Sequence, residues 1–194
     1  MKLVRMFLTI IALLSISASS PAPEPAEAQV VDAGFTQAVT GMNGWYLSDV
    51  TITALSPVVA DGKLLQPGEI LTISNESEQR IEYTSPDRKS TAAQIIRIDK
   101  TAPLMTINDL YHRGDGATIL SVSVIDVVSG PAALDTSLDN GLTWQTYPVS
   151  GDGSVPEVVW DIEVAPDSTG PILARAVDVA GNTSVIVKFI GAVK

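Results

Sequence analysis

Few residues of this chain could take part in chemistry, and most of those that could are carboxylates. The 194 residues include 22 Asp and Glu, one histidine and no cysteine. Cysteine nucleophiles, disulfides and thiolate metal sites are therefore excluded, and a single histidine excludes zinc sites built from several histidines. His112 lies in the polar segment "DLYHRGDG" with no nucleophile elbow nearby, so a Ser-His-Asp triad is not predicted. We expect a protein that is not an enzyme.

The segment "SLDNGLTW" has the most distinctive spacing of polar groups in the chain. A hydroxyl, a carboxylate, a glycine and a second hydroxyl occupy alternate positions, at Ser137, Asp139, Gly141 and Thr143. This pattern suits a β-hairpin turn, because the carboxylate can accept hydrogen bonds from backbone amides and the glycine can adopt a positive φ. We therefore predict structural roles for these residues, with Trp144 packed back over the hairpin.

The same spacing resembles the Asp-box of sialidases. A sialidase active site implies a β-propeller of several hundred residues, with arginines for the substrate carboxylate and a tyrosine nucleophile. This chain has 194 residues and one such box, so the resemblance implies a hairpin and not catalysis. An alternative is that exposed Trp144 and Tyr147 form a platform for a sugar, which needs an apolar ring face.

Aspartates in predicted loops are the candidate ligands for a metal ion. Ca²⁺ is a hard cation that takes six to eight oxygen ligands, but no EF-hand or other fixed ligand spacing is present. We expect these carboxylates to be solvated turn residues and the protein to have no cofactor, with Ca²⁺ binding as the alternative. Asp178 and Asn182 are expected to close their own turn, in which Gly181 adopts a positive φ. The aspartates concerned are Asp126, Asp135, Asp139, Asp152 and Asp178.

Composition predicts a folded, acidic protein. Hydrophobic residues make up 45% of the chain, which is enough for a packed core. The net charge of −10 and the sequence pI of about 4.4 disfavour nucleic-acid binding, which requires a basic stripe that this sequence does not supply.

The N-terminal 28 residues are typical of an export signal followed by a spacer. Lys2 and Arg5 precede a short apolar run from Met6 to Ile16, which is the plan of a secretory signal peptide. The segment "SSPAPEPAEAQ" is rich in Pro, Ala and Glu and is expected to stay extended. We expect a secreted protein or one on the outer face of the envelope, with an uncleaved membrane anchor as the alternative.

Beyond residue 30, apolar and polar residues alternate in short segments. Apolar residues at every second position predict half-buried strands, and the turn residues between them, with no helical period anywhere, favour an all-β sandwich. The side chains expected to face the interior include Val50, Ile52, Ala54, Leu120, Val122, Val124, Trp160, Ile162, Val164, Ile172, Ala174, Ala176, Val185, Val187 and Phe189.

Three further motifs resemble the edges of bacterial immunoglobulin-like domains from secreted and surface proteins. They are "GMNGWYLSDVTIT" (41–53), "RIDKTAP" (97–103) and "RAVDVAGNTS" (175–184). In those families a domain often opens with a Gly-Trp-Tyr strand, closes with an Asp-x-Ala-Gly-Asn turn and continues through an Ile-Asp-Lys-Thr-Ala-Pro linker. The resemblance implies two tandem immunoglobulin-like domains, covering residues 33–100 and 103–194.

The two expected domains differ in completeness. The second carries "DVVSG" (126–130), the Asp-box segment and "DVAGN" (178–182) in the order that such domains show. The first has a shortened middle, and a β-sandwich of that size is marginal on its own, so we expect it to lean on the second domain. The resemblance implies a surface module with a structural or adhesive role, whose partner is an unknown surface protein or glycan. The alternative is a carbohydrate-binding accessory module associated with glycan-processing enzymes.

Overall fold

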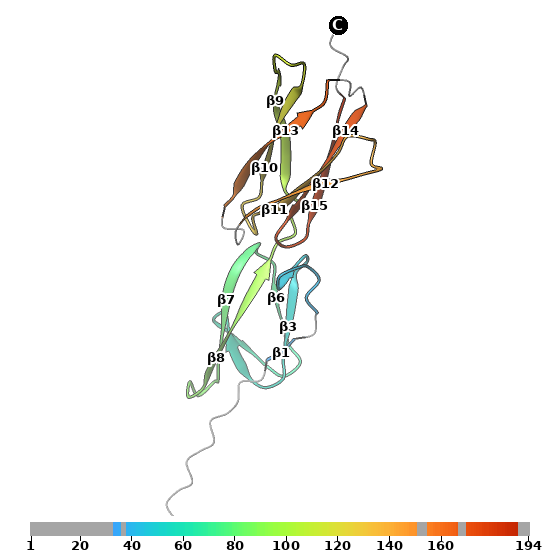
Figure 1. Ribbon diagram of the computed structural model, residues 1–194. Helices are drawn as coiled ribbons and strands as arrows, with labels where there is room; N and C mark the ends of the chain where they lie inside the picture. The colour runs from blue at the N-terminus through green and yellow to red at the C-terminus, as the bar shows by residue number, and fades with distance from the viewer. Residues whose placement is uncertain (1–32, 36–37, 151–154, 167–169, 190–194) are drawn as a thin grey trace, which may run out of the picture.

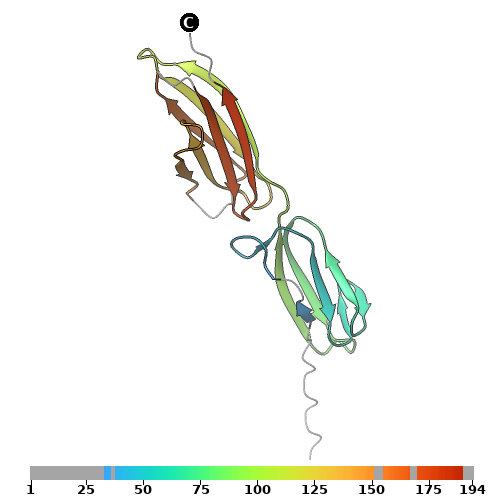
Figure 2. The ribbon, with the colours of Figure 1, turned by 90° about the vertical axis from the view of Figure 1, so that its right-hand side faces the viewer.

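The computed structural model describes residues 33–35, 38–150, 155–166 and 170–189, and within these ranges the chain is all β (Figure 1). The predicted signal and spacer, residues 1–28, lie outside the described residues. No helix in the described part of the chain is long and apolar enough to cross a membrane. The strands form two lobes stacked end to end, as two perpendicular views show (Figures 1 and 2).

The N-lobe consists of two sheets that enclose one apolar core. A three-stranded sheet has the order β1-β3-β6, and a five-stranded sheet has the order β2-β8-β7-β4-β5. The strands are β1 (Ala33–Phe35), β2 (Trp45–Tyr46), β3 (Val50–Ala54), β4 (Val58–Ala60), β5 (Lys63–Leu65), β6 (Ile70–Ile73), β7 (Ser77–Thr84) and β8 (Thr91–Ile98). The largest fully buried side chains of this core are Val50, Ile52, Val58, Leu65, Ile96 and Ile98.

The C-lobe is built in the same way around a separate core. Its three-stranded sheet has the order β13-β10-β9 and its four-stranded sheet the order β12-β11-β14-β15. The strands are β9 (Leu104–His112), β10 (Thr118–Ile125), β11 (Pro131–Ser137), β12 (Gln145–Pro148), β13 (Glu157–Val164), β14 (Pro171–Asp178) and β15 (Thr183–Phe189). Leu120, Val122, Val124, Leu134, Ile162 and Val164 are its largest fully buried side chains.

The period-two pattern identified the interior face correctly in most strands. In β3, Val50, Ile52 and Ala54 are buried while the threonines between them are half-buried. In β14, Ile172, Ala174 and Ala176 are buried, as predicted. Trp160 is half-buried and packs against the C-lobe core.

The prediction for β15 was wrong, because Val185, Val187 and Phe189 face outward. They are 62%, 49% and 75% exposed. The pairing places Ala174 opposite Ile186 and Ala176 opposite Ser184, so the even-numbered residues of β15 face the core. The hydroxyl of Ser184 is buried there without a hydrogen-bond partner among the described residues.

The turn between β14 and β15 explains this register. Asp178 Oδ1 accepts hydrogen bonds from the amides of Gly181 at 2.6 Å and Asn182 at 2.8 Å. The Asp178 amide in turn donates to the carbonyl of Asn182 at 3.1 Å. Because turn geometry sets the register of a hairpin, and a slip of one residue moves every side chain to the other face, the turn overrides the apolar pattern of β15.

We expect two substitutions in β15 to distinguish these registers. Ile186→Ser should lower the free energy of unfolding by about 1–3 kcal/mol, because Ile186 packs against the C-lobe core. Val187→Ser should change it by no more than about 0.5 kcal/mol, because Val187 is 49% exposed. Urea denaturation measures both, and a larger loss from Val187→Ser would contradict the observed register.

Candidate functional site at the junction between the lobes

Four segments that are far apart in the sequence meet where the two lobes join. They are residues 41–44 before β2, residues 99–101 after β8, residues 126–130 between β10 and β11, and residues 178–182 in the β14–β15 turn. Hydrogen bonds between these segments, given below, connect the N-lobe to the C-lobe. The three motifs of the immunoglobulin-like resemblance and "DVVSG" therefore contribute to one junction.

The loop at residues 41–44 forms the first contact between the lobes. The Met42 amide donates to the carbonyl of Ala180 at 2.7 Å, and Asn43 Nδ2 donates to the carbonyl of Val179 at 2.9 Å. Gly41 lets the loop approach this closely, because a Cβ at that position would lie 2.6 Å from the Ala180 carbonyl oxygen. The "GMNG" sequence thus fits against the turn formed by "DVAGN".

Asp99 in the linker forms the second contact. It is fully buried, and its amide donates to the carbonyl of Tyr46 in the N-lobe at 3.0 Å. Its Oδ2 accepts a hydrogen bond from the amide of Ser129 at 3.2 Å, and its carbonyl accepts one from Asn182 Nδ2 at 3.2 Å. One residue therefore bonds to both lobes.

Two more buried aspartates hold the turns that Asp99 contacts. Asp126 Oδ1 accepts hydrogen bonds from the amides of Val128 at 3.1 Å, Ser129 at 2.9 Å and Gly130 at 2.7 Å. Asp178 closes the β14–β15 turn as described above, and its Oδ2 accepts a bond from Asn182 Nδ2 at 2.9 Å. Gly181 has φ 99°.

The carboxylates of Asp99, Asp126 and Asp178 form one buried cluster. One oxygen from each lies within 4.8 Å of the others, and the ion pairs of the described residues use other carboxylates. Burial raises the pKa of Asp99 and of Asp178, because it disfavours the charged form, and the neighbouring carboxylate adds to the rise. A cluster of hard oxygen ligands could hold a hard cation.

The structure brings together two of the five aspartates considered as Ca²⁺ ligands and adds Asp99. Asp135 Oδ2 instead accepts hydrogen bonds from Arg175 Nε at 3.0 Å and Nη2 at 2.7 Å. Asp139 lies in its hairpin, and Asp152 is outside the described residues. Sequence reasoning missed Asp99 because it was interpreted only as part of a linker.

The Asp-box segment forms a closed hairpin turn in the C-lobe, away from the junction. Asp139 Oδ1 accepts hydrogen bonds from the Thr143 amide and the Ser137 hydroxyl, both at 2.8 Å, and Oδ2 accepts one from the Thr143 hydroxyl. Ser137 Oγ accepts the Gly141 amide at 2.8 Å, and Gly141 has φ 88°. These bonds, led by that from the Thr143 hydroxyl, lower the pKa of Asp139 to about 2.

Trp144 and Tyr147 differ in their exposure and contacts. Trp144 is 40% exposed, its Nε1 donates to the Gly141 carbonyl at 3.2 Å, and the Arg175 guanidinium lies 5.1 Å from its ring centroid. Tyr147 is half-buried, pairs with the core residue Leu134 and packs against the C-lobe core. Tyr147 therefore offers less of its ring to a ligand than the exposed Trp144 does.

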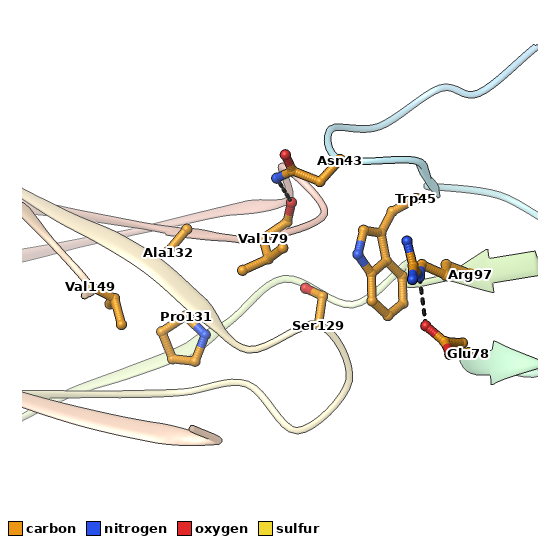
Figure 3. A pocket seen from close by; sticks show the side chains of 9 residues that line it. All are labelled: Asn43, Trp45, Glu78, Arg97, Ser129, Pro131, Ala132, Val149 and Val179. Carbon is orange, nitrogen blue, oxygen red and sulfur yellow. Dashed lines mark hydrogen bonds and ion pairs between the residues drawn. The ribbon is translucent and has the colours of Figure 1, made fainter. Parts of the chain in front are cut away.

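A groove of about 570 Å³ opens beside the junction, with walls from both lobes (Figure 3). The N-lobe wall carries the Trp45 ring and an ion pair between Arg97 Nε and Glu78 Oε2 at 2.6 Å. The C-lobe wall is mainly apolar. The residues that line the groove are Asn43, Trp45, Glu78, Arg97, Ser129, Pro131, Ala132, Val149 and Val179.

Comparison with known proteins assigns no family. No protein-family model matches the chain, and no curated protein matches it. Among solved structures, a chain described as "Cytokine receptor complex - Crystal form 1A" is similar over 84% of this chain and 98% of its own length, with 14% sequence identity and a TM-score of 0.38. A likeness at this level carries no inference about function.

Gly41→Ala should weaken the junction. The new Cβ would lie 2.6 Å from the backbone oxygen of Ala180, and overpacking of this kind costs about 1–3 kcal/mol. Gly114→Ala is the matched control, because a Cβ there has no atom within 4 Å. We expect a lower midpoint of urea unfolding for Gly41→Ala only, and equal midpoints would contradict the close contact.

The buried cluster should make stability depend on pH in a defined direction. Asp99 has a raised pKa in the folded state, so the folded state binds its proton more tightly than the unfolded state. Stability is then lost as the pH rises from the ordinary value of 3.8 through the raised pKa. Removing the charge with Asp99→Asn should relieve this loss, so the variant should gain stability relative to the natural protein over that window.

Asp139→Asn is the control of opposite sign. The pKa of Asp139 is lowered to about 2, so its charged form stabilises the fold above pH 3.8 and this contribution disappears as the pH falls. The measurement is thermal unfolding against pH, in a buffer with a chelator so that only protons can neutralise the cluster. A pH-independent difference between Asp99→Asn and the natural protein would contradict the cluster's role.

Proposed function

We propose that this protein is an exported, non-enzymatic surface module that holds two β-sandwich domains at a fixed angle. The observation that carries the proposal is the junction, where Met42, Asn43 and Asp99 hydrogen bond across the lobes. A flexible tether needs none of these bonds. A structural element that spaces other parts of a surface protein requires a joint that resists bending.

The sequence supports the finer parts of this proposal. Its N-terminal 28 residues are typical of a signal peptide and spacer, and the motifs at the junction resemble those of bacterial immunoglobulin-like domains. Two lobes that each pair two sheets around one core are compatible with that resemblance. We therefore infer a tandem of immunoglobulin-like domains, the first one shortened, on a bacterial cell surface.

Carbohydrate binding through Trp144 is the second candidate function. The ring is 40% exposed, which favours a contact with a ligand, but Arg175 lies over it and Tyr147 packs into the core instead of beside it. A single ring of this kind gives weaker support than the junction gives to the structural role.

The distance between the lobes should have one narrow distribution in solution. The chain lacks cysteine, so cysteines introduced at the exposed positions Lys63 and Asp161 would carry the only two spin labels. Double electron–electron resonance on the full chain should give a single narrow peak, which Gly41→Ala should broaden. A pair at Asp161 and Thr183, within the C-lobe, is the control that Gly41→Ala should leave unchanged.

A broad distribution in the natural protein would overturn the rigid joint and leave only a flexible tether. A narrow distribution that Gly41→Ala does not change would show that the contact at residues 41–44 does not fix the angle.

A further inference from the structure

The groove beside the junction has features that a joint alone does not require. Figure 3 shows the Trp45 ring facing Ser129 and Val179 across it, with Arg97 and Glu78 beside the ring. A volume of about 570 Å³ lies in the range of small-molecule sites, which are often found between domains. We propose that this groove binds a short neutral saccharide that contacts both lobes.

The indole N–H of Trp45 is a hydrogen-bond donor on the N-lobe wall of the groove. The side chain is 9% exposed, and Figure 3 shows its nitrogen on the edge of the ring that faces Val179 and Ser129. This nitrogen has no protein acceptor among the described residues and is not one of their buried unpartnered atoms, so it is open to the groove and free to donate to a ligand oxygen. A hydroxyl oxygen of a sugar in the groove would accept this bond.

The ion pair on the N-lobe wall supplies the complementary groups. Arg97 donates through Nε to Glu78 Oε2, and its terminal nitrogens have no partner in the described part of the chain. The side chains of Arg97 and Glu78 are 43% and 53% exposed. A sugar hydroxyl both donates and accepts, so neighbouring hydroxyls can bond to the guanidinium and the carboxylate together.

The opposite wall suits the carbon face of a sugar ring. Pro131, Val149 and Val179 line it from the C-lobe, and sugar rings bury C–H groups against apolar surface while their hydroxyls point to polar groups. The groove therefore has a polar wall and an apolar wall from different lobes. A saccharide between them would contact both.

Charge favours a neutral ligand. Arg97 is already neutralised by Glu78, and the chain carries a net charge of −10, so an anionic ligand would meet an unfavourable field. A peptide strand is disfavoured for another reason: the Trp45 amide donates to Met42 and its carbonyl accepts from Gly41, so the backbone there cannot add a strand.

The test is an array of neutral and acidic oligosaccharides probed with the full chain, followed by calorimetric titration of the neutral sugars that bind. Trp45→Phe keeps a ring in the wall and removes the N–H, and we expect it to weaken binding about three- to tenfold, the usual effect of one hydrogen bond. Glu78→Gln, at an exposed position, should weaken binding without affecting folding. Trp144→Phe is the matched control and should bind like the natural protein.

Three results would overturn the proposal. They are the absence of binding to neutral sugars, binding that Trp144→Phe removes and Trp45→Phe retains, and binding only to acidic sugars that weakens with salt. The second would place the sugar at the Asp-box hairpin instead. The spin-label distances on the same proteins separate this proposal from the structural one, because the joint can be rigid whether or not the groove binds a sugar.

Discussion

The arrangement of the two lobes depends on the hydrogen bonds of one buried linker residue, Asp99. A buried polar group costs free energy unless it is paired, and the partners of Asp99 belong to Tyr46 in the N-lobe and to Ser129 and Asn182 in the C-lobe. Separating the lobes would exchange these bonds for bonds to water and lose their net contribution to stability. The linker therefore does more than connect the lobes, because Asp99 bonds through its amide to the N-lobe and through its carboxylate and carbonyl to the C-lobe.

The turns of the C-lobe carry out two tasks with the same residues. Asp178 closes the β14–β15 turn and so sets the register of β15, which turns Val185, Val187 and Phe189 outward. The carbonyls of Val179 and Ala180 in that turn accept the bonds from the N-lobe. The geometry that determines one hairpin thus also builds the surface on which the other lobe rests.

The closed junction brings the carboxylates of Asp99, Asp126 and Asp178 together, which costs free energy of folding. Burial raises the pKa of Asp99 and Asp178, which means that their charged forms are less stable there than in water. Backbone amides offset part of that cost, three of them at Asp126 alone. The groove beside the cluster lies between the same two lobes, so a ligand there would act on the joint directly.

The sequence alone determined the all-β architecture, the interior face of most strands and the turn residues, because these depend on local periodicity and on the conformations open to Gly, Asp and Asn. It failed at β15, where the apolar alternation predicted that Val185, Val187 and Phe189 face the core, whereas the Asp178 turn sets a register that turns them outward. It identified "GMNG", "DKTAP", "DVVSG" and "DVAGN" separately, but not their meeting point, since their contacts join residues as far apart in the chain as Met42 and Ala180. Only the tertiary structure brought Asp99 to Asp126 and Asp178 and opened a groove at Trp45, because the packing of one lobe on the other decides both.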